Sequence, residues 1–157
     1  MNTDALVAKL DGMIGAGEDF ESILGTAVKE LHEGDPSFDW TGIYELFPDE
    51  TLRLGPFEGA PTDHVFIGVG RGVCGTAVAE KRNLNIPDVR AVDNYLACST
   101  ETRSELVVLI RDGDHIFAQI DIDSHQVNAF GDDQVERVQR IADVLSRAYQ
   151  ARRAATS

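Results

Sequence analysis

Residues 104–124 read SELVVLIRDGDHIFAQIDIDS, and this stretch decides the fold. Two runs rich in branched and aromatic side chains, 104–111 and 115–123, flank the pair Asp112-Gly113. An Asp-Gly pair between two such runs is a strong signal for a tight turn, because glycine readily adopts the positive φ angles that these turns require. The stretch therefore predicts two antiparallel strands joined by a hairpin.

The second strand of this hairpin carries two carboxylates that should share a face. Asp121 and Asp123 are two residues apart, whereas the isoleucines at 120 and 122 should point toward the core. The hairpin also places Glu105 near them, so three carboxylates could converge. Such a group would favour a bound cation or ammonium group, or would hold a proton for transfer. The alternative is an exposed strand end with Glu105 facing solvent, and the spacing alone leaves both interpretations open.

The rest of the chain supplies helices and further strands around the hairpin. Apolar residues recur at helical spacing in two segments within residues 3–33 and again over 132–152. Shorter runs predict strands at 39–47, 51–54, 65–69 and 84–86, and a short helix at 76–79. We therefore expect one α+β domain over residues 1–157, with a central antiparallel sheet and helices packed mainly on one side.

Residues 68–75 read GVGRGVCG and contain a formal GxGxxG pattern before the expected short helix. One interpretation is a dinucleotide site, in which glycines let the pyrophosphate approach a helix N-terminus. The other is a tight strand-to-helix turn, which we favour because the pattern lies mid-chain and little chain remains for a substrate domain. A helix N-terminus here would favour a thiolate at Cys74. A structural role for this cysteine is the alternative.

Two further features are candidates for chemistry. Cys98 lies in the polar stretch 88–103, and a cysteine there is either reactive or inert; nearby Arg103 would stabilise its thiolate if the fold brings the two together. Trp40 and Tyr44 are four residues apart on an expected strand and so share a face. They either belong to the core or wall a pocket for a methyl or thioether group.

Composition excludes several classes of partner. The 157 residues carry 27 acidic and 14 basic side chains, for a formal net charge of −13. Such a charge repels nucleic acid and anionic membrane surfaces. The N-terminus has no basic and apolar leader, and no run approaches the roughly 18 apolar residues of a membrane span. We therefore expect a cytoplasmic protein. The two cysteines are too few for a disulfide framework, and no CxxC or adjoining carboxylate and histidine cluster predicts a metal site.

Several segments, taken in order, resemble the free methionine-(R)-sulfoxide reductases, a family of GAF domains. Each motif alone is weak, but the ordered set is specific and spans nearly the whole chain after the first helices. The resembling segments are WTGIY at 40–44, LGPFEG at 54–59, GRGVCGTA at 70–77, PDV at 87–89, LAC at 96–98, SELV at 104–107 and DIDS at 121–124.

The resemblance implies a single GAF domain with a redox mechanism. Cys98 would attack the sulfoxide sulfur as a thiolate and become a sulfenic acid as methionine leaves. A second thiol would then condense with it, and a thioredoxin-type reductant would restore the enzyme. Glu105, Asp121 and Asp123 would hold the substrate ammonium and supply a proton, and Trp40 and Tyr44 would line the methyl-thioether pocket. No other cofactor or metal is implied. The apolar faces of the terminal helices could also pair two copies into a homodimer.

The sequence departs from the family at one thiol. Members commonly carry a third cysteine just after the Gly-Pro-Phe segment, where this chain reads GAPTDH at 59–64 and His64 stands in the missing position. Three routes remain: Cys74 resolves Cys98, an external thiol does so, or the enzyme does not turn over. The last route leaves a second interpretation, a non-catalytic GAF domain that senses a small molecule or redox state.

Overall fold

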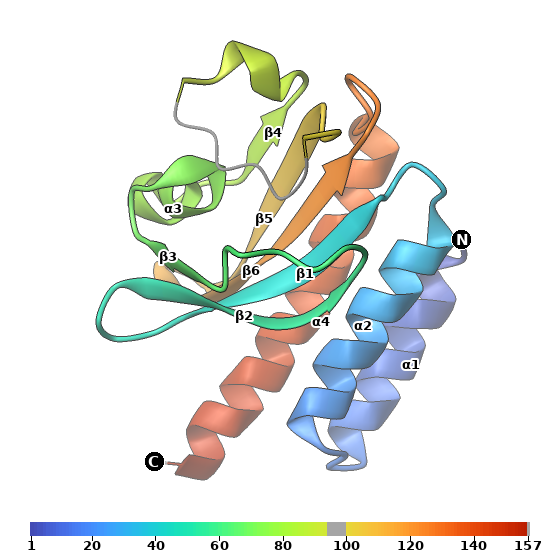
Figure 1. Ribbon diagram of the computed structural model, residues 1–157. Coiled ribbons are helices and arrows are strands. Elements are labelled where there is room, and N and C mark those ends of the chain that lie inside the picture. Colours follow the sequence, from blue (N-terminus) through green and yellow to red (C-terminus); the bar gives the residue numbers. More distant parts are fainter. Residues whose placement is uncertain (94–99, 157) are drawn as a thin grey trace.

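A computed structural model describes residues 1–93 and 100–156, and these form a six-stranded sheet in the order β3-β2-β1-β6-β5-β4 (Figure 1). Every strand pairing among them is antiparallel. The predicted hairpin forms the centre of the sheet, which confirms the interpretation of residues 104–123. The strands are β1 Trp40–Leu46, β2 Thr51–Glu58, β3 Phe66–Gly68, β4 Leu84–Ile86, β5 Ser104–Asp112 and β6 His115–Ser124.

The longer helices cover one face of the sheet, and α3 lies against the other (Figure 1). The helices are α1 Thr3–Gly15, α2 Phe20–Gly34, α3 Gly72–Glu80 and α4 Asp132–Thr156, with a 3-10 turn η1 at Val89–Ala91. Asn2 and Asp19 cap the N-termini of α1 and α2 through their side chains, as helix starts require. The expected α+β fold, with helices mainly on one side, is confirmed. No helix of the described residues is long and apolar enough to span a membrane.

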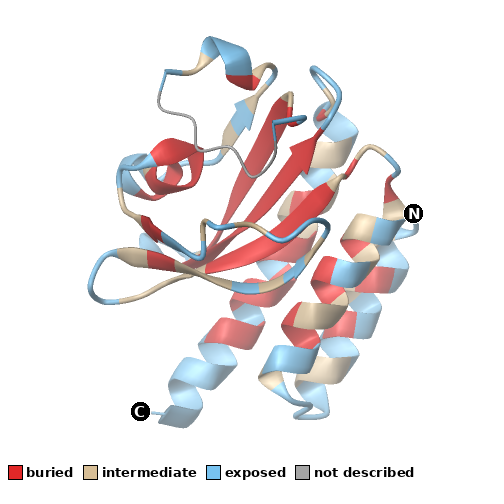
Figure 2. Cartoon of the chain, viewed as in Figure 1, coloured by how far each residue is buried: buried red, intermediate tan, exposed pale blue. Residues whose placement is uncertain are grey.

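The sheet separates two apolar cores, because side chains alternate between its faces. On the face covered by α1, α2 and α4, Ala118, Ile120 and Ile122 of β6 pack against the helices. On the opposite face, β5 residues such as Val107 and Leu109 pack against α3. Figure 2 shows the central strands buried along most of their length. Beyond residue 118, the odd-numbered residues of β6, which include two aspartates, therefore face α3.

Helix α3 begins four residues earlier than the sequence pattern predicts, inside the glycine run. Gly70 and Gly72 have φ angles of 91° and 64°, which let the chain turn from β3 directly into the helix. Gly75 lies so close to the preceding turn that a Cβ there would stand 2.5 Å from the Gly68 carbonyl oxygen. The glycines therefore allow α3 to pack closely against the turn that precedes it. With no parallel strand pairing among the described residues, the dinucleotide interpretation of the glycine pattern is wrong.

Candidate functional site

Three carboxylates converge on the α3 side of the hairpin. Glu105 of β5 lies opposite Asp123 of β6, and Asp121 stands two residues along β6 on the same face. Glu105 is 3% exposed, and Asp121 and Asp123 are each 1% exposed. The expected convergence is confirmed, and the alternative, in which the strand end and Glu105 face solvent, is wrong. Three carboxyl groups buried side by side are costly when charged, so their presence points to a ligand or to shared protons.

Cys74 joins this group from the first turn of α3. Its Sγ lies 3.8 Å from Oε2 of Glu105, and one ligand atom from each of Cys74, Glu105 and Asp121 lies within 4.8 Å of the others. Gln119 of β6 donates a hydrogen bond from Nε2 to the Cys74 carbonyl, at 3.0 Å, and so holds α3 against the sheet. The sequence pattern does not predict that this cysteine lies beside the carboxylates. The glycine run was the available signal, since it brings α3 so close to the preceding turn.

Burial and mutual repulsion favour the protonated forms of these groups. Burial, followed by the charges of Asp121 and Asp123, raises the pKa of Glu105 well above its ordinary value. Burial also raises the pKa of Asp121. Burial, followed by the charges of Asp121 and Glu105, raises the pKa of the Cys74 thiol. The prediction that the helix N-terminus makes Cys74 a thiolate is therefore wrong: desolvation and three nearby carboxylates outweigh the dipole of a nine-residue helix.

The aromatic pair lies beside the site on β1, and Tyr44 lines its cavity whereas Trp40 does not. Trp40 and Tyr44 lie on the α3 face with ring centroids 6.2 Å apart, which confirms the expected shared face. The Tyr44 hydroxyl donates a hydrogen bond to the His64 carbonyl at 2.8 Å, and Trp40 Nε1 donates to the Ala60 carbonyl at 3.0 Å. Both bonds fasten the segment between β2 and β3 over the site. Gly42 lies directly under the Trp40 ring, where a Cβ would collide with the indole.

A small cavity lies between these groups. Its volume is about 10 Å³, which is room for about one water molecule. A larger hollow of about 470 Å³ lies at the far end of β1 and β6, but its carboxylate Glu45 is already bonded to Tyr149 and Arg152. The carboxylates and the thiol therefore mark the small cavity as the candidate site. The residues that line it are Tyr44, His64, Ile67, Gly72, Val73, Cys74, Glu105 and Asp121.

Comparison with known proteins agrees with this architecture. The GAF domain family model matches residues 19–149. The chain is 37% identical over 133 residues to a free methionine-R-sulfoxide reductase of Escherichia coli, covering 84% of this chain and 79% of that protein. The chain belongs to the free methionine-R-sulfoxide reductase family of GAF domains.

Solved structures of this reductase family superpose on most of the chain. A type II free methionine-R-sulfoxide reductase from Thermoplasma acidophilum is 36% identical with a TM-score of 0.78, covering 83% of this chain and 94% of that one. The free methionine-R-sulfoxide reductase of Neisseria meningitidis, solved in complex with its substrate, is 27% identical with a TM-score of 0.87. That match covers 98% of this chain and 91% of the Neisseria chain.

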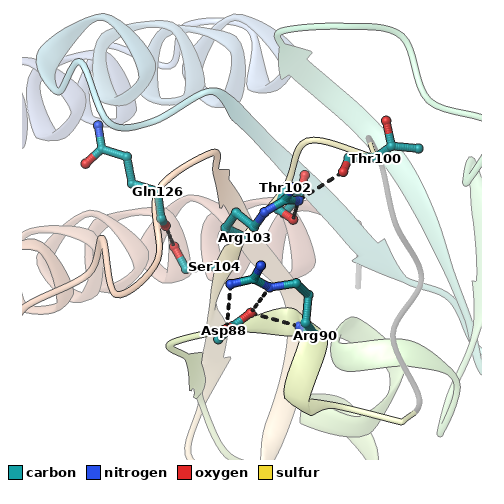
Figure 3. A network of polar contacts seen from close by, with 7 residues as sticks. All are labelled: Asp88, Arg90, Thr100, Thr102, Arg103, Ser104 and Gln126. Carbon is teal, nitrogen blue, oxygen red and sulfur yellow. Dashed lines mark hydrogen bonds and ion pairs between the residues drawn. The ribbon is translucent and has the colours of Figure 1, made fainter.

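Cys98, the nucleophile that the reductase family implies, lies in the segment 94–99, outside the described residues. The chain on either side of that segment is well anchored (Figure 3). Asp88 accepts two hydrogen bonds from the Arg90 side chain at 2.9 Å, and Ser104 donates to the Gln126 carbonyl at 2.6 Å. Arg103 directs its guanidinium to the carbonyls of Thr100 and Thr102, at 3.0 Å each. Its support of a Cys98 thiolate stays a prediction.

Proposed function

We propose that this chain reduces free L-methionine-(R)-sulfoxide to L-methionine at the site between α3 and the β5–β6 hairpin. The observation that carries the proposal is the buried group of Glu105, Asp121 and Asp123 beside a thiol. A free amino acid carries an ammonium group that a peptide-bound methionine lacks, and buried carboxylates are its natural partners. Trp40 and Tyr44 would form the apolar wall for the methyl and thioether groups.

The reaction would begin at Cys98. Its thiolate attacks the sulfoxide sulfur, the oxygen passes to the cysteine, and methionine leaves; the Cys98 sulfur is oxidised by two electrons and the sulfoxide is reduced by two. The reaction consumes one proton, which the carboxyl group of Glu105 or Asp121 would deliver to the sulfoxide oxygen. The product on the enzyme is a cysteine sulfenic acid. No metal or organic cofactor takes part in these steps.

The sulfenic acid would then be resolved by a thiol. If Cys74 does so, its sulfur bonds to that of Cys98 and water leaves, and a reductant of the thioredoxin type reduces the disulfide with its own dithiol. Cys74 is buried, so this route requires its thiol to become accessible to Cys98. An external thiol is the alternative. Both routes fit a reducing cytoplasm and a role in oxidative stress, and a homodimer stays an expectation for sizing experiments to test.

The R and S epimers of free methionine sulfoxide test the proposed activity. We expect release of methionine from the R epimer with dithiothreitol as reductant, and no significant release from the S epimer, because one face of a chiral sulfur meets a fixed nucleophile. Quantifying methionine by chromatography checks this. Binding of methionine without turnover of either epimer would instead favour the sensor interpretation.

Tyr44→Phe tests whether the segment between β2 and β3 must be fastened for substrate binding. Loss of the hydrogen bond to the His64 carbonyl should lower the free energy of unfolding by about 1 kcal/mol. If the bond also positions the pocket wall, KM for the R epimer should rise about fivefold, the equivalent of about 1 kcal/mol. Urea unfolding and steady-state kinetics measure the two effects.

Tyr149→Phe is the matched control for this change. Tyr149 is also buried, and its hydroxyl donates a hydrogen bond to Glu45 at 3.1 Å, but it lies near the far end of β1. We expect a comparable loss of stability and an unchanged KM. Equal KM values in all three proteins would show that the Tyr44 bond does not support substrate binding.

A further inference from the structure

We propose that Cys74, Glu105 and Asp121 form a binding site for one divalent cation of the zinc class, and that the bound ion closes the pocket to an amino acid. This site lies beyond the reductase activity. It uses a thiol and two carboxylates that come from three elements, α3, β5 and β6 (Figure 1).

The spacing of the ligand atoms suits a small four-coordinate ion. Sγ of Cys74 and Oε2 of Glu105 are 3.8 Å apart, and the three ligand atoms lie within 4.8 Å of one another. Ligands at about 2.3 Å for sulfur and about 2.0 Å for oxygen, arranged tetrahedrally, stand about 3.5 Å apart. The site must therefore contract by little more than about an ångström. The hydrogen bond from Gln119 to the Cys74 carbonyl holds the thiol in place from behind.

An unpartnered atom at the site points independently to a cation. Oδ1 of Asp121 has no solvent contact and no hydrogen-bond partner among the described residues, although the side chain lines the cavity. A buried carboxylate oxygen without a partner is costly, and a cation would supply the missing interaction. Asp123 adds a third buried carboxyl group opposite Glu105.

The types of ligand atom at this site indicate which metals would bind. Cys74 binds as a thiolate and Glu105 and Asp121 bind as carboxylates, so the protons that these groups carry pass to solvent when the metal enters. Thiolate with carboxylate favours Zn²⁺ or Cd²⁺ over Mg²⁺ and Ca²⁺, which prefer oxygen ligands alone. The cavity of about 10 Å³ admits a single ion or water. Water can complete the coordination. An ion on these carboxylates would exclude an ammonium group from them.

Cadmium titration of the full chain tests the site directly. In a Cys98→Ser background Cys74 is the sole thiol, so a cadmium–thiolate charge-transfer band in the ultraviolet reports on it alone. With a phosphine reductant, we expect one Cd²⁺ per chain and displacement by Zn²⁺. Asp121→Asn keeps the side-chain shape and removes one ligand charge, and should weaken binding at least about tenfold. Asp114→Asn, at an exposed turn, makes the same chemical change and should leave the affinity unchanged.

Each outcome decides a separate point. Absence of the band, or an affinity that Asp121→Asn leaves unchanged while circular dichroism shows a folded chain, overturns the metal site. Methionine at saturation should raise the half-saturating cadmium concentration; no change would overturn the claim that the ion closes the pocket. Metal binding in a protein that releases no methionine from either epimer would leave this site standing and refute the proposed function.

Discussion

Replacing Cys98 by serine is expected to lower turnover of the R sulfoxide by about 10³-fold or more, the size of effect seen when an enzyme loses its nucleophile. A serine hydroxyl is scarcely ionised near neutral pH and cannot form a sulfenic acid, so no oxygen can be transferred to the enzyme. A methionine-release assay with dithiothreitol measures the loss. Trapping with a sulfenic-acid reagent should label the original protein and not Cys98→Ser.

Cys74→Ser is the informative companion. If Cys74 resolves the sulfenic acid, this variant should keep its activity with dithiothreitol, which can attack Cys98 directly, and lose most of it with a thioredoxin-type reductant. Non-reducing mass spectrometry of the oxidised original protein should then show a Cys74–Cys98 disulfide. Full activity of Cys98→Ser would refute the mechanism, whereas unchanged activity of Cys74→Ser with both reductants would refute only the role of Cys74.

Gly75→Ala is expected to lower the free energy of unfolding by about 2–3 kcal/mol. The added Cβ would stand 2.5 Å from the Gly68 carbonyl oxygen and 3.0 Å from the Gly70 nitrogen, and backbone atoms cannot rotate away as a side-chain end can. The first turn of α3 must therefore shift and take Cys74 with it. Urea unfolding measures the stability change, and weaker cadmium binding in the Cys98→Ser background would report the displaced thiol.

Gly25→Ala makes the same chemical change where the opposite result is expected. A Cβ at Gly25 meets nothing within 4 Å, and the residue lies inside α2. Because alanine favours a helix over glycine, the variant should gain about 0.5–1 kcal/mol. If Gly75→Ala matched the original protein in stability, the close approach of α3 to the glycine turn would be refuted.

The alternation of side chains in residues 104–124 was sufficient to predict the centre of the fold. A turn at Gly113-Asp114, one residue later than the sequence pattern predicts, joins β5 to β6, and their pairing places Glu105 opposite Asp123. The isoleucines at 120 and 122 meet the helices, and the aspartates between and beyond them face the other way. These features follow from the two-residue period of a strand, which is local, so they can be predicted from one sequence.

Burial of the carboxylates and the position of Cys74 were decided by the tertiary structure. The period shows which face a residue takes, but not that α3 covers that face, because Cys74 of α3 is 31 residues from Glu105 in the sequence and reaches it through a glycine turn. The pKa of the Cys74 thiol depends on this cover: a helix N-terminus in solvent would lower it, and burial beside three carboxylates raises it. The sequence by itself thus determined the hairpin, the shared face and the family resemblance of this chain. Only the packing of α3 onto β5 and β6 brings the thiol and the carboxylates together in one buried site. Desolvation and charge repulsion act through space, so their effect on these residues, which are distant in the chain, depends on that packing.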